Sequence, residues 1–386
     1  MTWTSKPLAQ VADLCLGKML DEKKNKGDLM PYLANVNVRW GEFDLDNLRE
    51  MRFEPHELER YGIKYGDIVM CEGGEPGRCA IWKDDVPGMM IQKALHRIRP
   101  KEELDHRFLY YAFLKKGRNN EFSGLFTGAT IKHLPGQNLA KVEVRYPSRP
   151  EQERIADVLT AYDDLIENNR RRIALLEQSA RLLYREWFVR LRFPGHEHVK
   201  VVDGVPEGWE RTTLGDVAEN HDRLRVPLSV LEREKRQGPY PYYGAASLLD
   251  HVDGYLFDGR YLLLGEDGTV VNSEGAPMLQ LVEGKFWVNN HAHVLTGKKV
   301  SLEFLYCCLS AYKIQGHITG VAQPKITQAN MNRIPVVLPS ESLMSDFQSS
   351  VKASFDQRFS LERLNETLRQ ARDLLLPRLM SGDLVV

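Results

Sequence analysis

The chain has 386 residues, 42% of them hydrophobic, and its formal net charge is −1 at pH 7. That length exceeds one ordinary domain and allows more than one core to be buried. The near-zero charge excludes nucleic-acid binding through bulk positive charge, so any such contact must come from local basic clusters.

The cysteines and the hydropathy pattern bear on the cellular compartment. No stretch of about 18 apolar residues occurs, and residues 1–4 lack the basic and apolar regions of an export signal. We therefore expect a soluble protein of the cytoplasm. A reducing cytoplasm also suits the five cysteines, which show no C-x-x-C spacing: Cys15, Cys71, Cys79, Cys307 and Cys308.

Residues 1–148 alternate short apolar runs with turn signals. Gly66-Asp67 precedes the apolar run Ile68–Met70, and Gly73–Gly77 holds three glycines and a proline. Such punctuation predicts short strands joined by tight turns. We expect a compact, strand-rich α+β globule over residues 1–148.

A long helix is predicted over residues 149–191. Pro150 and Glu151 mark its first turn, and no Gly or Pro follows until after Arg190. Its apolar residues alternate steps of four and three, as in a coiled coil, although an amphipathic helix on an ordinary core is the alternative. The predicted seam contains Ile155, Leu159, Tyr162, Ile166, Asn169, Ile173, Leu176 and Leu183.

Residues 192–208 are predicted to be a linker, and residues 209–340 to be a second globule. The linker carries His196 and His198, but an isolated H-x-H pair in a solvated segment is far more often structural than a metal site. The second globule contains the aromatic run Tyr240–Gly244 and the turn Gly265–Thr269, and both patterns resemble the punctuation of the first globule.

A second helix and a short tail are predicted over residues 341–386. Its pattern slips around residues 358–360, and Pro377 is expected to kink or end it. Neither helix is apolar all round, so their simplest solution is to pair with each other, antiparallel because a globule connects them. The predicted seam of this helix contains Phe347, Val351, Leu361, Leu364, Leu368 and Leu375.

The second half of the chain repeats the plan of the first. Thr127-Gly128 recurs as Thr319-Gly320, and Leu182-Leu183 recurs as Leu374-Leu375, in each case 192 positions later (319 − 127 = 192; 374 − 182 = 192). One structural unit has therefore been used twice. We expect a pseudo-two-fold protein with two similar globules and two long helices.

The search for catalytic motifs is negative. The sequence has no G-x-x-x-x-G-K-[ST] loop, no N-P-P-[FYW] tetrapeptide and no local signature of a nucleophile with its base. His291 and His293 are expected to alternate along a strand and share a face, but no third metal ligand is evident nearby. We expect a binding protein without catalytic residues, metal or cofactor of its own.

Several segments resemble the specificity subunit of type I restriction-modification systems. Pro147–Ala156, Asp163–Arg171 and Trp187-Phe188 resemble its first central conserved region. Val205–Trp209 resembles the entry to its second target recognition domain, and Leu374–Gly382 resembles its C-terminal end. One departure is Ser342-Leu343-Met344, which replaces Pro150-Glu151-Gln152 in the second repeat and leaves the start of the second helix uncertain.

The resemblance implies a non-catalytic DNA-recognition subunit. Each target recognition domain would read one half of a bipartite, asymmetric site in double-stranded DNA, and the paired helices would set the unread gap. Two modification subunits, which bind S-adenosylmethionine and methylate adenine at N6, would dock on this chain. Motor-nuclease restriction subunits would complete the complex.

The candidate DNA contacts are side chains that can bond base edges or phosphates. Amide and guanidinium groups can bond bidentately to purine edges, whereas Lys and Thr can hold phosphate. For each of them the alternative is an ordinary solvated or strand residue. The candidates are Arg78, Gln92, Lys93, Thr130, Lys132 and His133 in the first globule, and Tyr242, Tyr243, Asn289, Asn290, His291, Gln323 and Lys325 in the second.

Two other classes of protein fit part of the pattern. A standalone bivalent repressor would need no partner, but its affinity would require more positive charge. A coiled-coil scaffold that joins two proteins would fit the charge, but would not explain the polar, aromatic-rich globules.

Overall fold

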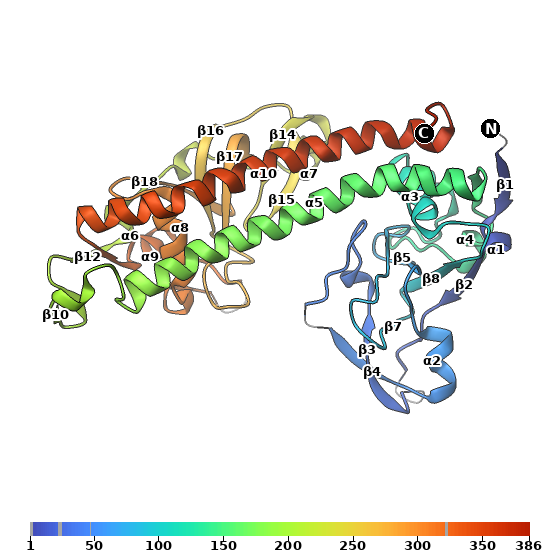
Figure 1. Ribbon diagram of the computed structural model, residues 1–386, viewed down its shortest axis with the longest axis horizontal. Helices are drawn as coiled ribbons and strands as arrows, with labels where there is room; N and C mark the ends of the chain where they lie inside the picture. Colours follow the sequence, from blue (N-terminus) through green and yellow to red (C-terminus); the bar gives the residue numbers. More distant parts are fainter. Residues whose placement is uncertain (1–2, 22–24, 47, 321–322) are drawn as a thin grey trace. The chain divides into compact units, whose positions relative to one another are not determined.

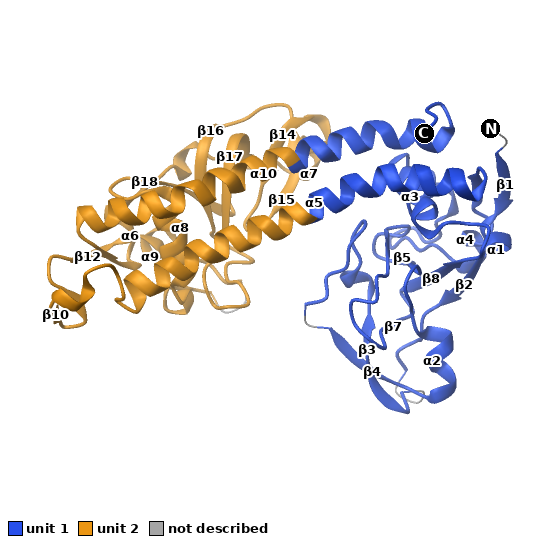
Figure 2. Cartoon of the chain, in the orientation of Figure 1, with its two compact units in different colours: residues 1–167, 365–386 blue, residues 168–364 orange. Residues whose placement is uncertain are grey.

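The computed structural model describes residues 3–21, 25–46, 48–320 and 323–386. The chain forms two compact units (Figure 2). The first unit comprises Met1–Glu167 and Asn365–Val386, and the second comprises Asn168–Leu364. Both units contain strands and helices, which confirms the α+β prediction. The expectation for residues 1–4 falls partly on residues 1–2, which lie outside the described residues.

The first unit is built on two sheets (Figure 1). One has the strand order β2-β8-β5-β6 and is antiparallel, and the other has the order β4-β3-β7. Strand β1 pairs separately with β9. The strands are β1 (Thr4–Pro7), β2 (Ala12–Leu16), β3 (Asp28–Leu33), β4 (Arg49–Phe53), β5 (Ile68–Cys71), β6 (Cys79–Ile81), β7 (Met90–Ile91), β8 (Leu95–Pro100) and β9 (Glu143–Tyr146). The short helices are α1 (Leu8–Val11), α2 (Pro55–Tyr61), α3 (His106–Arg118) and α4 (Gly136–Leu139).

The second unit has one larger sheet with the strand order β13-β18-β16-β17-β14-β15. Two further pairs join β12 to β19 and β10 to β11. The strands are β10 (Val201–Val202), β11 (Val205–Pro206), β12 (Glu210–Thr213), β13 (Ala218–Asn220), β14 (Gln237–Tyr243), β15 (Leu248–Val252), β16 (Phe257–Gly265), β17 (Leu279–Val288), β18 (Ala292–Gly297) and β19 (Pro335–Leu338). The short helices are α6 (Leu214–Val217), α7 (Val230–Lys235), α8 (Leu302–Ala311) and α9 (Gln328–Asn332).

The two units place equivalent elements in the same order along the chain. In the second unit, strand β17 pairs with both β16 and β14. In the first unit two strands take its place, because β6 pairs with β5 and β7 pairs with β3. Between β6 and β7, Asp84 and Gly88 adopt positive φ angles of 59° and 68°, and Pro87 cannot donate to a ladder. The same sheet plan is therefore continuous in the second unit and split in the first.

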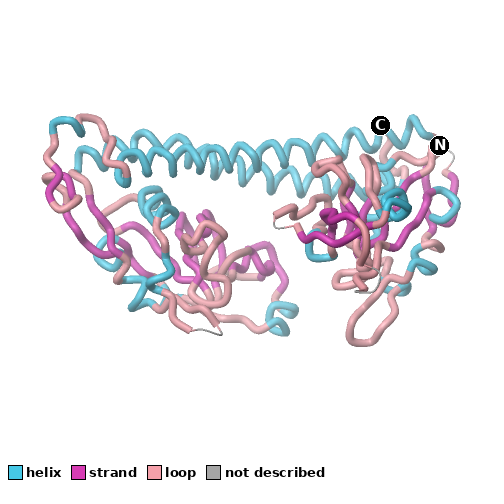
Figure 3. Tube along the Cα trace, turned by 90° about the horizontal axis from the view of Figure 1, so that it is seen from below, coloured by secondary structure: helices cyan, strands magenta, loops and turns pink. Residues whose placement is uncertain are grey.

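Two long helices contribute to both units. Helix α5 spans Arg149–Tyr184 and continues as a π-helical turn, Arg185–Val189, while α10 spans Glu341–Ser381. Within each unit α5 and α10 lie alongside each other (Figures 1 and 3). In the first unit, the contacts of Asp163 with Arg372 and of Ile166 with Asn365 show that the two helices are antiparallel.

The seam of α10 differs from the prediction in its middle. Leu364 is 46% exposed, so its assignment to the seam is wrong, whereas the neighbouring Asn365 is only 2% exposed. From Val351 onward, steps of four and three pass without a slip through Phe355, Arg358, Glu362, Asn365, Arg369, Arg372, Leu376 and Leu379. The predicted slip arose because Leu361 and Leu364 stand one position before Glu362 and Asn365; Leu361 is buried as predicted, at 6% exposure, whereas Leu364 is exposed.

Polar contacts replace apolar ones where this seam is polar. In the second unit, Nε of Arg358 lies 2.6 Å from Oε1 of Glu177, and its Nη2 donates to the Leu281 carbonyl at 3.1 Å. In the first unit, Arg372 pairs with Asp163, and Nδ2 of Asn365 donates to the Ile166 carbonyl at 3.4 Å. Such buried polar pairs can fix the register of two helices.

Pro377 does not end α10, because the helix continues to Ser381. Leu376, Leu379 and Met380 around it are buried in the core of the first unit, and this packing offsets the missing backbone donor. The same core includes Ile155 and Leu159 of α5, two of the predicted seam residues.

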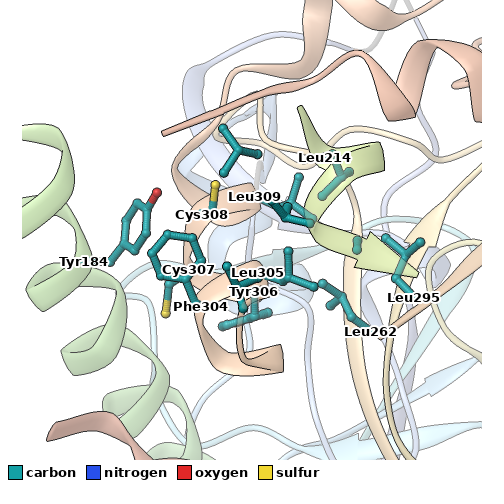
Figure 4. Packing of buried hydrophobic residues seen from close by; sticks show 14 of the residues in the cluster. Tyr184, Leu214, Leu262, Leu295, Phe304, Leu305, Tyr306, Cys307, Cys308 and Leu309 are labelled. Atoms are coloured by element: carbon teal, nitrogen blue, oxygen red, sulfur yellow. The ribbon is translucent and has the colours of Figure 1, made fainter. Parts of the chain in front are cut away.

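In the second unit the helices pack on α8. Tyr184 of α5 lies at a ring-centroid distance of 5.4 Å from Phe304 of α8 and 6.0 Å from Phe347 of α10. Figure 4 shows Tyr184 beside Cys307 and Cys308, the buried cysteines of α8. Each globule is therefore fastened to its own stretch of the helix pair by an aromatic and aliphatic core.

Candidate nucleic-acid interface

An equivalent tight turn follows a parallel strand pair in each unit. Strand β7 runs parallel to β3, and the end of β17 runs parallel to β14. After these pairs, Oε1 of Gln92 accepts the N–H of Ala94 at 3.2 Å, and Oδ1 of Asn289 accepts the N–H of His291 at 2.8 Å. Gln92 and Asn289 thus shape their turns and leave Lys93 and Asn290 exposed at the equivalent central position.

A second equivalent element is a loop that closes on itself. Thr127 and His133 pair through both backbone groups at 2.9 Å, and Thr319 and Lys325 do so at 2.8 Å. We call residues 127–133, and the described residues 319–320 with 323–325, the glycine loops, because each contains a glycine at its second position, Gly128 or Gly320. Thr130 and Lys132 are exposed in the first loop, and Gln323 is exposed in the second.

One glutamate joins the turn to the loop in each unit. The N–H of Glu72 donates to the Ala94 carbonyl at 2.8 Å, and its carbonyl accepts the N–H of Leu134 at 2.7 Å. Glu266 makes the same two bonds, with His291 at 2.8 Å and Ile326 at 2.7 Å. The turn and the glycine loop therefore lie on either side of this residue in both units.

The side chains of these glutamates bind the last residue of their loops. Glu72 lies 3.0 Å from Nδ1 of His133, and Glu266 lies 3.1 Å from Nζ of Lys325. The sequence predictions missed both glutamates. Their shared position directly after an apolar strand, β5 or β16, is the signal that could have found them.

A buried histidine supports each loop from below. In the first unit, Nε2 of His96 lies 2.8 Å from the carbonyl of Leu134, the residue directly after the glycine loop. In the second unit, Nε2 of His293 lies 2.8 Å from the equivalent carbonyl of Ile326. Burial lowers the pKa of His96, which favours a neutral ring that donates through Nε2. In His293 the other nitrogen, Nδ1, faces Asp222 at 2.5 Å, so both nitrogens face acceptors and the ring can donate to both only as an imidazolium.

The carboxylates around His293 are ionised. Burial acts to raise the pKa of Asp222, but the hydrogen bond and charge of His293 outweigh it and the net pKa is lowered. The pKa of Glu266 is also lowered, because Arg225 and His293 together outweigh burial. Arg225 donates to Glu266 at 2.7 Å and lies 3.3 Å from Asp222.

This cluster revises the metal expectation for the second unit. His291 lies in the turn before β18 and pairs with Asp267, so it does not share a strand face with His293 as predicted. Ligand atoms of Asp222, Glu266 and His293 lie within 4.8 Å of one another, and no such neighbours were evident in the sequence. The guanidinium of Arg225 already supplies a positive charge between the two carboxylates.

Three predicted contact residues have side chains that are buried or turned inward. Tyr242 is 1% exposed, and its hydroxyl accepts the N–H of Leu228 at 2.9 Å, so it is a core residue. Asn289 is 5% exposed. Arg78 points inward, where it donates to the Asn35 carbonyl at 3.0 Å and pairs with Glu75 at 2.8 Å.

The remaining candidates form one accessible group in each unit. Tyr243 is half-buried against Phe286, and Gln92 is partly buried in its turn, so neither side chain is among the most accessible candidates. The accessible groups present ammonium, imidazole, hydroxyl and amide groups, which can bond phosphates and base edges. They are Lys93, Thr130, Lys132 and His133 in the first unit, and Asn290, His291, Gln323 and Lys325 in the second.

The family follows from comparison with known proteins. The family model described as the type I restriction modification DNA specificity domain matches residues 1–178 and 206–355. The chain belongs to this family. Each matched segment contains one of the two turns, one of the two glycine loops and part of a long helix.

Relatives and a solved structure agree with this assignment. The chain is 26% identical over 340 residues to the type I restriction enzyme MjaIX specificity subunit of Methanocaldococcus jannaschii, covering 83% of this chain and 78% of the relative. It is 33% identical over 148 residues to the putative specificity subunit S.HindORF215P of Haemophilus influenzae, covering 38% and 37%. The S subunit from M. genitalium shares the fold, with a TM-score of 0.52, 19% identity and coverage of 98% and 96%.

No helix among the described residues is long and apolar enough to cross a membrane.

Proposed function

We propose that this chain is the DNA-recognition subunit of a type I restriction-modification complex, and that each unit reads one half of a bipartite site. The observation that carries the proposal is the repeated assembly of turn, glutamate and glycine loop, which exposes a group of base- and phosphate-bonding side chains in both units. The same support with different exposed residues, such as Lys93 against Asn290, suits two halves of different sequence.

The electrostatics favour binding within a complex. The 52 Lys and Arg residues are offset by 53 Asp and Glu residues, so the formal net charge is −1 and the chain alone should bind DNA weakly. Partner subunits would supply further phosphate contacts. We propose two modification subunits, which carry S-adenosylmethionine and methylate adenine at N6, and motor-nuclease subunits that cut unmodified DNA.

The chain itself is proposed to be non-catalytic and to set the gap between the half-sites through α5 and α10. The test is to purify the chain alone and with its modification subunit, and to map methylated adenines on genomic DNA. We expect site-specific methylation only from the complex. Robust methylation by the chain alone would contradict the assignment.

The division of labour between the units has its own test. The double variant Asn290→Ala/Gln323→Ala should relax the sequence requirement of one half-site, and Thr130→Ala/Lys132→Ala should relax that of the other. Each variant is the control for its counterpart, because all four side chains are exposed on the turn or glycine loop of their unit. Equal loss of specificity in both halves from either variant would mean that the units do not read independently.

A further inference from the structure

The two glycine loops place one residue at the same point of their turns. A Cβ on Gly128 would lie 2.2 Å from the carbonyl oxygen of Ile131, and a Cβ on Gly320 would lie 2.3 Å from that of Gln323. Both glycines have left-handed backbones, with φ of 90° and 83°. Ile131 and Gln323, each three residues after its glycine, are therefore equivalent, and each turns its carbonyl toward the glycine.

The side chains at this point are exposed. Ile131 is 64% exposed and lies between Thr130 and Lys132, which are also exposed. Single exposed apolar side chains are common on protein surfaces, so exposure alone is weak evidence for a binding role. Here the apolar side chain stands in the middle of an otherwise polar contact group, at the position where the other unit has an amide.

The base of the loop holds this position firmly. Leu134, directly after the first loop, is fully buried, and its backbone is bonded on one side to Glu72 at 2.7 Å and on the other to His96 at 2.8 Å. The pairing of Thr127 with His133 closes the loop above it. A side chain presented from such a closed and anchored turn can discriminate between ligands, because little freedom of the loop backbone remains to be lost on binding.

We propose that the residue three places after the loop glycine is a base-reading position in each unit: Ile131 contacts the 5-methyl group of a thymine, and Gln323 bonds the edge of an adenine. The inference rests on the proposed function. In the major groove only thymine offers a methyl group, which suits an apolar side chain, while an amide can bond N6 and N7 of adenine together. The difference between Ile131 and Gln323 would then be a difference in the base required.

The test uses the full chain in complex with its modification subunit. Selection from a randomised DNA library defines the two half-sites, and the half that relaxes in the Thr130→Ala/Lys132→Ala variant is assigned to the first unit. Each thymine of that half is then replaced by uracil, which lacks only the methyl group. For the unaltered chain, we expect one uracil to weaken binding about fourfold, the value of one buried methyl group.

Variants at position 131 separate this contact from a general effect of the loop. Ile131→Val should keep the preference for thymine over uracil, and Ile131→Ala should lose it while the other half-site is still read. Ile131→Gln should select adenine at that position. Gln323→Ala should relax one adenine position in the other half and leave the thymine preference unchanged.

Several results would overturn the inference. One is an unchanged ratio of thymine to uracil binding in Ile131→Ala, and another is a first half-site without any required thymine. In both cases the unaltered complex would still be sequence-specific, so the proposed function would stand. A complex without any sequence preference would overturn the inference and the proposed function together.

Discussion

Oδ2 of Asp222 lies 2.5 Å from Nδ1 of His293, and the opposite nitrogen of the same ring lies 2.8 Å from the carbonyl of Ile326 at the end of the second glycine loop. A carboxylate after β13 is thereby linked through the imidazole ring of His293 to the loop. Asp222 also accepts the N–H of Val294 at 2.9 Å through its other oxygen. Two acceptors are needed here, and a carboxylate supplies both.

Asp222→Asn should loosen the second glycine loop, because an amide can accept with only one of its two ends. The loss of a charged hydrogen bond is expected to cost about 2 to 3 kcal/mol of local stability. Hydrogen exchange of peptides that contain Ile326, in the full chain, measures this cost. The matched control is Asp253→Asn, whose exposed pair with Arg236 should contribute less than about 1 kcal/mol. Equal effects of the two variants would contradict the proposed link.

The same cluster should make the second unit sensitive to acid. The pKa values of Asp222 and Glu266 are lowered in the folded protein. These carboxylates therefore stabilise the fold fully above their unfolded-state pKa of about 4, and this stabilisation is lost as pH falls through their folded-state pKa values. Unfolding of the full chain by urea between neutral pH and about pH 3 measures the effect. The double variant Asp222→Asn/Glu266→Gln should be less stable at neutral pH and show a flatter acid decline. A parallel decline in both proteins would contradict the assignment.

A buried charge joins the helices within the second unit. Arg358 is 6% exposed and contacts Glu177 and Glu362, and the hydroxyl of Tyr306 also donates to Glu177 at 2.9 Å. Arg358→Met should cost about 3 kcal/mol, because it leaves the partly buried carboxylate of Glu177 without its cation. The double variant Arg358→Met/Glu177→Met should recover much of that loss, since an apolar pair of similar size can replace a buried ion pair. Urea unfolding of the three proteins decides this, and a double variant less stable than the single one would contradict it.

The helices show how far the sequence predicts the fold. Steps of four and three in α5 are carried by apolar residues such as Ile155 and Leu159, and their burial follows the pattern. In α10 the seam passes through Arg358, Asn365 and Arg372, which apolar periodicity cannot detect. Leu364 was wrongly placed in the seam, because a leucine on the exposed face is indistinguishable in sequence from a leucine in a seam.

The contact residues show a different limit. Tyr242 and Asn289 have suitable chemistry, but the parallel pairing of β14 with β17 buries both of them, and that pairing joins residues about 45 positions apart. The repeat also changes register between elements. Leu134 corresponds to Ile326 at an offset of 192, Glu72 to Glu266 at 194 and His96 to His293 at 197 (326 − 134 = 192; 266 − 72 = 194; 293 − 96 = 197). Insertions between elements hide this equivalence from a search for a fixed period.

The loop glycines should tolerate no side chain. Gly128→Ala would force a Cβ to within 2.2 Å of the Ile131 carbonyl in a left-handed backbone, so the loop must rearrange. We expect binding of the first half-site to fall at least about tenfold, a loss of about 1.4 kcal/mol that matches the lower range of such strain. Binding of library-selected DNA by the complex measures it.

Matched controls exist in both units. A Cβ on Gly124, three residues before the first loop, or on Gly316, three residues before the second, would have nothing within 4 Å. Gly124→Ala and Gly316→Ala should therefore bind as the unaltered chain does, whereas Gly320→Ala should impair only the second half-site. Normal binding by both loop variants would show that the glycine loops do not contact DNA.

The last prediction concerns the gap between the half-sites. Seven residues inserted between Glu167 and Asn168, and seven between Leu364 and Asn365, keep the steps of four and three and leave the contacts within each unit unchanged. The insertion lengthens each helix by about 10 Å, at about 1.5 Å per residue. With base pairs about 3.4 Å apart, this corresponds to about three base pairs. Selection from a DNA library with randomised spacers should return the same half-sites with a gap longer by about that amount. An insertion in α5 alone is the control, because it breaks the match between the helices and should abolish selective binding. Recovery of the original gap with undiminished affinity from the double insertion would show that α5 and α10 do not set the distance.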